Sequence, residues 1–239
     1  MMDNIVPAIK ILYEDNHLLI VNKPAGIPVQ PGKDGDEALE FLAKKYLKEK
    51  YQKPGNVFLG VSHRIDRPVS GIVILAKTSK ALARINEMFK NRTVEKTYWA
   101  VVENPPPDAE GYLLHWLKKD EKINKSRAYD KELPGSLRSE LHYKLISKSE
   151  HYYLLEVCPA TGRHHQIRVQ LSAIGCPIKG DIKYGARRTN PNGNIHLHAR
   201  AVSFLHPVRK QKVTITAPVP DDPLWQYFEK TSPAAETIS

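Results

Sequence analysis

The chain contains very little cysteine. Only Cys158 and Cys176 occur among its 239 residues, and neither belongs to a CxxC pair. A disulfide framework and a structural zinc site are therefore unsupported, and a reducing compartment is favoured. No apolar run is long enough to cross a membrane, and the first residues lack the pattern of a secretory signal or a transit peptide. We expect a cytoplasmic protein, of the compact kind found in bacteria, with no membrane partner.

Several common enzyme motifs are also missing. The sequence has no GxGxxG after a strand, no GxxxxGK[ST] loop and no GxSxG elbow. Dinucleotide-binding, NTP-binding and serine-hydrolase functions therefore lose support. A glycosidase mechanism would need two carboxylates close together in space, and the sequence singles out no such pair.

Positive charge is in surplus, with 36 lysines and arginines against 26 acidic residues and a net charge of +10. This balance favours a polyanionic partner, with nucleic acid ahead of an anionic membrane surface. A generically basic soluble protein is the alternative. The basic residues do not form a tail but are spread over 44–53, 63–67, 118–131, 163–168 and 183–212. That spread favours a broad binding groove.

The spacing of apolar residues predicts an α+β protein. We expect strands within 9–23 (two, with a turn at Asp15-Asn16) and at 57–65, 71–76, 95–104, 138–147, 151–158, 195–207 and 212–219. Helices are expected at 36–51, 79–91 and 223–230, and a further helix follows the glycine turn of 161–175. No repeat or long linker divides the chain, so 1–239 is expected to be a single domain with its core at about 9–220.

Two segments are predicted to lie outside that core. Residues 108–135 are polar and basic, which indicates a hairpin and loop that leave the core. Residues 231–239 are expected to be a frayed tail.

The stretch "VSHRIDRPVSG", residues 61–71, places one carboxylate among basic side chains. Asp66 follows His63 and Arg64 and precedes Arg67. An aspartate in a polar turn commonly serves as a cap or balances surface charge, so the residues alone favour that interpretation.

A second basic cluster holds Arg163, His164, His165 and Arg168. Gly162 and Arg163 are expected at the start of a helix, where free amides and the positive end of the dipole favour a phosphate. Adjacent histidines would face different sides of that helix, which is poor geometry for a metal. His196 and His198 would share a strand face, but no further ligand completes a site. We therefore expect no metal.

Four ordered motifs carry a resemblance. "HRIDRPVSG", "EKTYWAVV", "TGRHHQIRV" and "GCPIKGDIKYG" together resemble the RluA family of pseudouridine synthases, over about residues 9–220. The resemblance implies the pseudouridine-synthase catalytic fold, with a mixed, largely antiparallel central sheet flanked by helices and loops. It implies a monomer, in the form without an N-terminal S4 domain, that uses no cofactor. The substrate would be a uridine in ribosomal or transfer RNA, whose base is detached from C1′, turned and rejoined through C5.

The same resemblance assigns the site residues. Asp66 would be the catalytic aspartate, which either adds to the sugar or removes a sugar proton to give a glycal. Burial alone favours a protonated carboxyl, whereas an adjacent guanidinium favours the ionised form, and Arg168 would be that partner. Tyr98 would stack on the uracil and assist proton transfer at C5. Arg64 or His63 would fill the vacated base stack, and the candidate phosphate contacts are Lys23, Arg67, Arg163 and Lys179.

The chain departs from the usual family pattern at three positions. Val69 replaces a threonine, His164 replaces a threonine or serine, and Gln170 stands where histidine is common. An RNA-binding or chaperone module without turnover is the main alternative. It explains the charge but not the combination of Asp66, Tyr98 and Arg168. A nucleoside hydrolase would lack its second acid or metal.

Overall fold

The computed structural model describes residues 9–32 and 37–232. Its strands are β1 (Lys10–Glu14), β2 (Leu18–Lys23), β3 (Gly60–Val61), β4 (Ser70–Ala76), β5 (Glu95–Val102), β6 (Glu110–Asp120), β7 (Lys125–Tyr129), β8 (Leu137–Lys148), β9 (Tyr153–Pro159), β10 (Leu197–Leu205) and β11 (Lys212–Thr216). Its helices are α1 (Leu39–Lys50), α2 (Ser79–Lys90), α3 (Gln166–Ala173), α4 (Pro223–Thr231) and the short 3₁₀ turn η1 (Ile182–Tyr184). None of these helices is long and apolar enough to cross a membrane.

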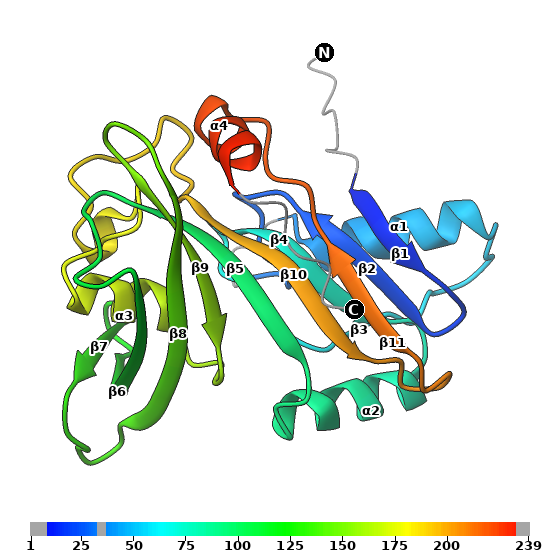
Figure 1. Cartoon of the computed structure of the whole chain (residues 1–239). Helices are drawn as coiled ribbons and strands as arrows, with labels where there is room; N and C mark the ends of the chain where they lie inside the picture. Colours follow the sequence, from blue (N-terminus) through cyan, green and yellow to red (C-terminus); the bar gives the residue numbers. More distant parts are fainter. Residues whose placement is uncertain (1–8, 33–36, 233–239) are drawn as a thin grey trace.

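The strands form one sheet in the order β1-β2-β4-β10-β5-β9-β8-β6-β7, and β11 and β3 pair with β10 and β4 (Figure 1). β4 and β10 run parallel, whereas the other neighbouring strands of the described chain pair antiparallel. The expected α+β class with a mixed, largely antiparallel sheet is confirmed. The parallel pair matters for the site, because it places the start of β4 beside the middle of the sheet.

Buried strands at the centre explain the apolar runs in the sequence. All seven residues of β4 are buried, as are residues 18–21 of β2. α1 buries Leu39, Ala43 and Leu47 in the same core, and α2 buries Ala81 and Ile85. The Thr78 hydroxyl caps α2 by accepting from the amide of Ala81, which satisfies one of the free amides of the first turn.

A smaller core lies under α4. It contains Trp99 and Val101 of β5, Leu154 of β9, and Trp225 and Phe228 of α4. Because side chains alternate along a strand, the residue before Trp99 faces the opposite side of the sheet. The expectation that Trp99 packs in the core is confirmed.

The strand expected at 57–65 is wrong in extent, since only Gly60 and Val61 pair with β4. Beyond Val61, two side chains replace backbone groups as the hydrogen-bond partners of β4. The Ser62 hydroxyl donates to the Ile74 carbonyl at 2.7 Å, and the Ile74 amide donates to His63 Nε2 at 2.9 Å. The backbone of this segment is thereby released from the sheet.

The segment 108–135 forms a hairpin, as expected, but it does not leave the core. β6 pairs with β8 from Glu110 to Leu117, and β7 pairs with β6 from Trp116 to Asp120, so the hairpin extends the central sheet. Leu113 and Leu117 are buried within this polar stretch, and their even spacing places them on one strand face. Of the tail expected to fray, residues 233–239 lie outside the described part, whereas 231 ends α4.

The close contact between β4 and β10 predicts that a side chain at position 71 strongly destabilises the fold. Its φ is +116°, and a Cβ there would overlap the backbone of Ala199. Gly175 has a φ of +78° with open space around it, so it serves as a matched control. We expect Gly71→Ala to lower the free energy of unfolding by about 2–5 kcal/mol and Gly175→Ala by about 1–2 kcal/mol. Urea denaturation of both variants checks this. Equal losses would contradict the close approach.

Candidate active site

Asp66 lies in a short turn just before β4, and neighbouring backbone holds that turn in place. The amide of Val69 donates to the Asp66 carbonyl at 3.0 Å. The Gly26 amide donates to the Arg67 carbonyl at 2.8 Å, and Arg67 Nε donates to the Gly26 carbonyl at 2.9 Å. The loop after β2 therefore fixes the turn, and with it the place of the carboxylate.

Arg168 of α3 joins Asp66 to a second acid. Its Nη1 donates to Asp66 Oδ2 at 2.9 Å, while Nε and Nη2 donate to the two oxygens of Asp181 at 2.7 and 2.8 Å. Arg168 is 5% exposed and Asp181 is 2% exposed. Burial lowers the pKa of Arg168, but Asp181 and then Asp66 raise it further, so the net shift is upward and the guanidinium stays charged.

Tyr98 faces the same place from β5, on the side of the strand opposite Trp99. It pairs with Ala199 of β10, and Ala199 pairs with Gly71 at the start of β4. Burial, and then the charge of Asp66, raise the pKa of Tyr98 above its ordinary value. Its hydroxyl therefore keeps its proton near neutral pH and can donate a hydrogen bond.

His165 completes the surroundings of Asp66. Its Nε2 lies 3.7 Å from Asp66 Oδ2, and its Nδ1 lies 2.9 Å from the Tyr184 hydroxyl. Burial lowers the pKa of His165 to about 3. The ring is neutral at ordinary pH, so its contact with Asp66 is dipolar rather than an ion pair.

The expected start of α3 is wrong. The helix begins at Gln166, and His165 before it has a φ of +54°, so Gly162 and Arg163 lie in a turn outside the helix. The Gln166 side chain forms that turn by accepting from the Thr161 hydroxyl (2.7 Å) and the Arg163 amide (3.0 Å). His164 and His165 do not face apart on a helix, because their rings stack with centroids 3.7 Å apart.

A cleft of about 1200 Å³ surrounds these groups. Asp66, Tyr98 and Arg168 all line it, so the structure brings the three expected catalytic residues together. The lining also includes eight lysines and arginines, namely Arg64, Arg67, Lys90, Arg92, Lys96, Lys119, Arg163 and Arg168. Among the described residues of the lining, Asp66 is the single carboxylate. A polyanion is the natural ligand of such a surface.

Four of the expected RNA contacts line this cleft: His63, Arg64, Arg67 and Arg163. Arg64 and Arg67 are exposed. His63 has a different setting, because it accepts from the Ile74 amide and packs on the Phe89 ring with centroids 4.7 Å apart. Burial lowers the pKa of His63 to about 3, so it is a neutral part of the wall.

Lys23 and Lys179 lie elsewhere. Lys23 is 0% exposed, and its Nζ donates to the carbonyls of Pro24, Ile27 and Arg67. Burial lowers its pKa to about 7. It supports the turns beneath the cleft and cannot contact a phosphate from there. Lys179 does not line the cleft; its Nζ bonds Asn190 Oδ1 at 2.5 Å.

Sequence reasoning missed several residues of the site. Asp181 lies in the quoted motif "GCPIKGDIKYG", but no spacing rule connects it to Arg168. Lys90, Arg92 and Lys96 lie within seven residues of one another, from the end of α2 to the start of β5. A count of basic residues in that connection could have suggested them. Over the described residues, no group of three or more His, Cys, Asp or Glu side chains could hold a metal.

A model of the RNA pseudouridylate synthase family matches residues 17–173, which is more than half of the chain. The chain belongs to the RluA-type family of RNA pseudouridine synthases. Within this family it is 36% identical over 220 residues to "Ribosomal large subunit pseudouridine synthase C" of Buchnera aphidicola subsp. Acyrthosiphon pisum, covering 89% of this chain and 68% of that protein. The protein of the same name from Vibrio cholerae is 35% identical over 221 residues, covering 87% and 65%.

The chain thus spans about two thirds of the length of these relatives. Among solved structures, "Human RNA Pseudouridylate Synthase Domain Containing 4" superimposes with a TM-score of 0.74 at 25% identity, covering 89% of each chain. A second human structure, "Human RNA Pseudouridylate Synthase Domain Containing 1", gives 0.70 at 22% identity. The family fold expected from the motifs is confirmed.

The contacts of Arg168 predict different roles for its two acids. Asp181→Asn leaves a buried guanidinium without its bidentate partner, and we expect a loss of about 3–5 kcal/mol in the free energy of unfolding. Asp66→Asn keeps Asp181 in place, and the Asp66 side chain is 30% exposed, so we expect a loss below about 1 kcal/mol. Urea denaturation of both variants is the measurement. A larger loss for Asp66→Asn would contradict this division.

Proposed function

We propose that this chain is an RNA pseudouridine synthase in which Asp66 carries out the reaction. The single observation that carries the proposal is the ionic setting of Asp66. One partly exposed carboxylate lies in a cleft with eight basic residues, and a buried arginine bonds one of its oxygens. Such a carboxylate is held in place for chemistry while its surroundings attract a polyanion.

The two oxygens of Asp66 have different surroundings. Oδ2 accepts from Arg168 and lies near His165. No hydrogen bond from the described residues uses Oδ1, and the side chain lines the cleft. Oδ1 is therefore the atom that reaches the ribose, either adding to the sugar or taking a sugar proton. In both versions the N1–C1′ bond breaks, the uracil turns, and C5 bonds to C1′.

Tyr98 and Arg168 have supporting parts in this proposal. The ring of Tyr98 stacks on the uracil, and its protonated hydroxyl takes part in moving the C5 proton. Arg168 orients Asp66 through its hydrogen bond to Oδ2. Arg64, an exposed residue two positions before Asp66, fills the space left by the extruded base, and Arg67 and Arg163 contact phosphates.

The relatives suggest the substrate. Two of them carry names that refer to the ribosomal large subunit, so we propose uridines of large-subunit ribosomal RNA as the substrate. A transfer RNA is the other substrate that the family resemblance allows, and mapping distinguishes the two.

The first test is pseudouridine mapping of total RNA. Cells with the wild-type gene, a deletion and the Asp66→Asn variant are compared. We expect at least one pseudouridine to be lost in both mutants, because an amide can neither add to the sugar nor accept its proton. Purified Asp66→Asn protein should bind that RNA as tightly as wild type.

Other outcomes have clear meanings. Turnover by Asp66→Asn close to wild type would overturn the role of Asp66. If an expressed wild-type protein modifies no site, the alternative of an RNA-binding module without turnover takes the place of the enzyme.

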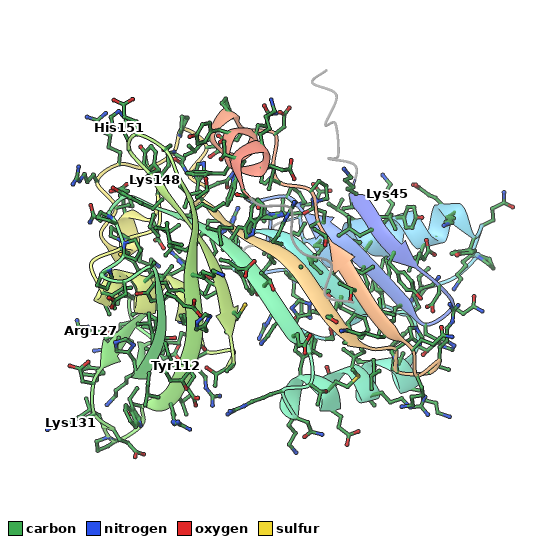
Figure 2. All side chains as sticks on the ribbon, in the orientation of Figure 1. Lys45, Tyr112, Arg127, Lys131, Lys148 and His151 are labelled. Carbon is green, nitrogen blue, oxygen red and sulfur yellow. The ribbon has the colours of Figure 1, made fainter. Side chains whose placement is uncertain are left out.

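The β6–β7 hairpin predicts a salt-dependent contribution to RNA binding. Lys119 lines the cleft, Arg127 is exposed on β7, and Lys131 is exposed in the loop that follows β7 (Figure 2). Replacing all three with glutamine should lower the slope of log affinity against log salt by about 0.7–0.9 for each phosphate that the variant no longer neutralises. Lys45→Gln with Lys148→Gln is the control. If wild type, the triple variant and the control have equal slopes, these three residues do not contribute to RNA binding.

A further inference from the structure

His164 occupies a place in the cleft that the proposed chemistry does not use. It lines the cleft next to His165, and the family pattern usually has a threonine or serine there. Its ring stacks on His165, which itself contacts Asp66. A side chain so close to the reacting carboxylate faces whatever RNA lies in the cleft.

A count of hydrogens fixes the protonation of the His164 ring. The Ser126 hydroxyl lies 2.8 Å from the His164 carbonyl oxygen and 2.9 Å from His164 Nδ1. The carbonyl can only accept, so the one hydroxyl hydrogen must point to it. Ser126 Oγ is then an acceptor toward the ring, and Nδ1 must carry the imidazole hydrogen.

The opposite nitrogen is therefore a bare acceptor. In a neutral imidazole with hydrogen on Nδ1, Nε2 carries a lone pair. Among the hydrogen bonds of residues 9–32 and 37–232, none uses His164 Nε2. Ser126 is 2% exposed, so the contact that sets this tautomer is protected from water.

The electrostatic surroundings keep the ring neutral. Burial lowers the pKa of His164; Asp66 and Glu121 oppose this, and Lys119 and Arg168 add to it. The net shift is downward from the ordinary value. At neutral pH the ring is uncharged, and a charged contact with phosphate is not its role.

We propose that His164 is a specificity-determining residue whose Nε2 accepts a hydrogen bond from a donor group of the RNA beside the target uridine. The inference rests on the proposed function. Phosphate oxygens offer no hydrogen, so the donor is either a ribose 2′-hydroxyl or a base N–H. A threonine or serine at this position could donate as well as accept. This chain can only accept here, which restricts the RNA groups that fit.

The test compares His164→Phe with His164→Gln. Phenylalanine keeps the stack on His165 and removes the acceptor, whereas the glutamine amide offers an oxygen at a similar reach. The probes are an oligouridine strand, its 2′-deoxy counterpart and a strand of N3-methyluridine, with affinity measured by fluorescence anisotropy at fixed salt. We expect His164→Phe to bind oligouridine about three- to tenfold more weakly than wild type, and His164→Gln to bind as wild type.

The modified strands identify the donor. If it is the 2′-hydroxyl, the difference between wild type and His164→Phe disappears on the 2′-deoxy strand and persists on the methylated strand; if it is the base N–H, the reverse holds. A difference that persists unchanged on both strands, or no difference on oligouridine, overturns the inference.

Measurements of turnover distinguish a failure of this inference from a failure of the proposed function. On the RNA identified by mapping, the effect of His164→Phe should appear in KM, with kcat within about twofold of wild type. An inactive wild-type protein would defeat the proposed function, while the affinity measurements would still decide the role of His164. A normal kcat also shows that the variant is folded.

Discussion

The buried guanidinium of Arg168 is the group on which the site depends. A desolvated charge is costly unless its hydrogens are paired, and Arg168 gives two donors to Asp181 and one to Asp66. The Tyr184 ring packs against it, 5.1 Å from centroid to Cζ. Three parts of the chain must therefore be placed correctly at the same time: α3, the segment with Asp181, and the turn with Asp66. The geometry around Asp66 is part of the stability of the fold.

The extended half of the sheet positions α3 for that arrangement. Gln166 Nε2 donates to the Glu140 carbonyl at 2.9 Å, and Gln170 Nε2 lies 3.2 Å from the carbonyls of Leu113 and Ser139. Two buried amides thus attach the helix to β6 and β8. The β6–β7 hairpin lies beside α3 (Figure 1). It also brings Lys119 to the cleft, so the same strands support the helix and supply charge.

The sequence predicted the elements better than it predicted the contacts between them. Apolar spacing located β4, α1, α2 and β5, because these elements bury a continuous face. It failed where side chains replace backbone bonds, as at Ser62 and His63, and where a positive φ at His165 delays α3. The family motifs identified Asp66, Tyr98 and Arg168. They could not show that Lys23 is buried, because a lysine beside a turn has the same sequence signal whether its Nζ meets water or carbonyls.

Charge is distributed so that binding and chemistry depend on different groups. Asp66, Arg168 and Asp181 together carry a net charge of about −1 at neutral pH. The attraction for a polyanion must then come from the other cations of the cleft, of which Arg64, Arg67, Lys90, Arg92 and Lys119 are exposed. His63, His164 and His165 all have pKa values lowered by burial, so they add no charge near neutral pH. Removing the Asp66 charge makes the cleft more positive. A variant that loses catalysis in this way therefore keeps its affinity for RNA.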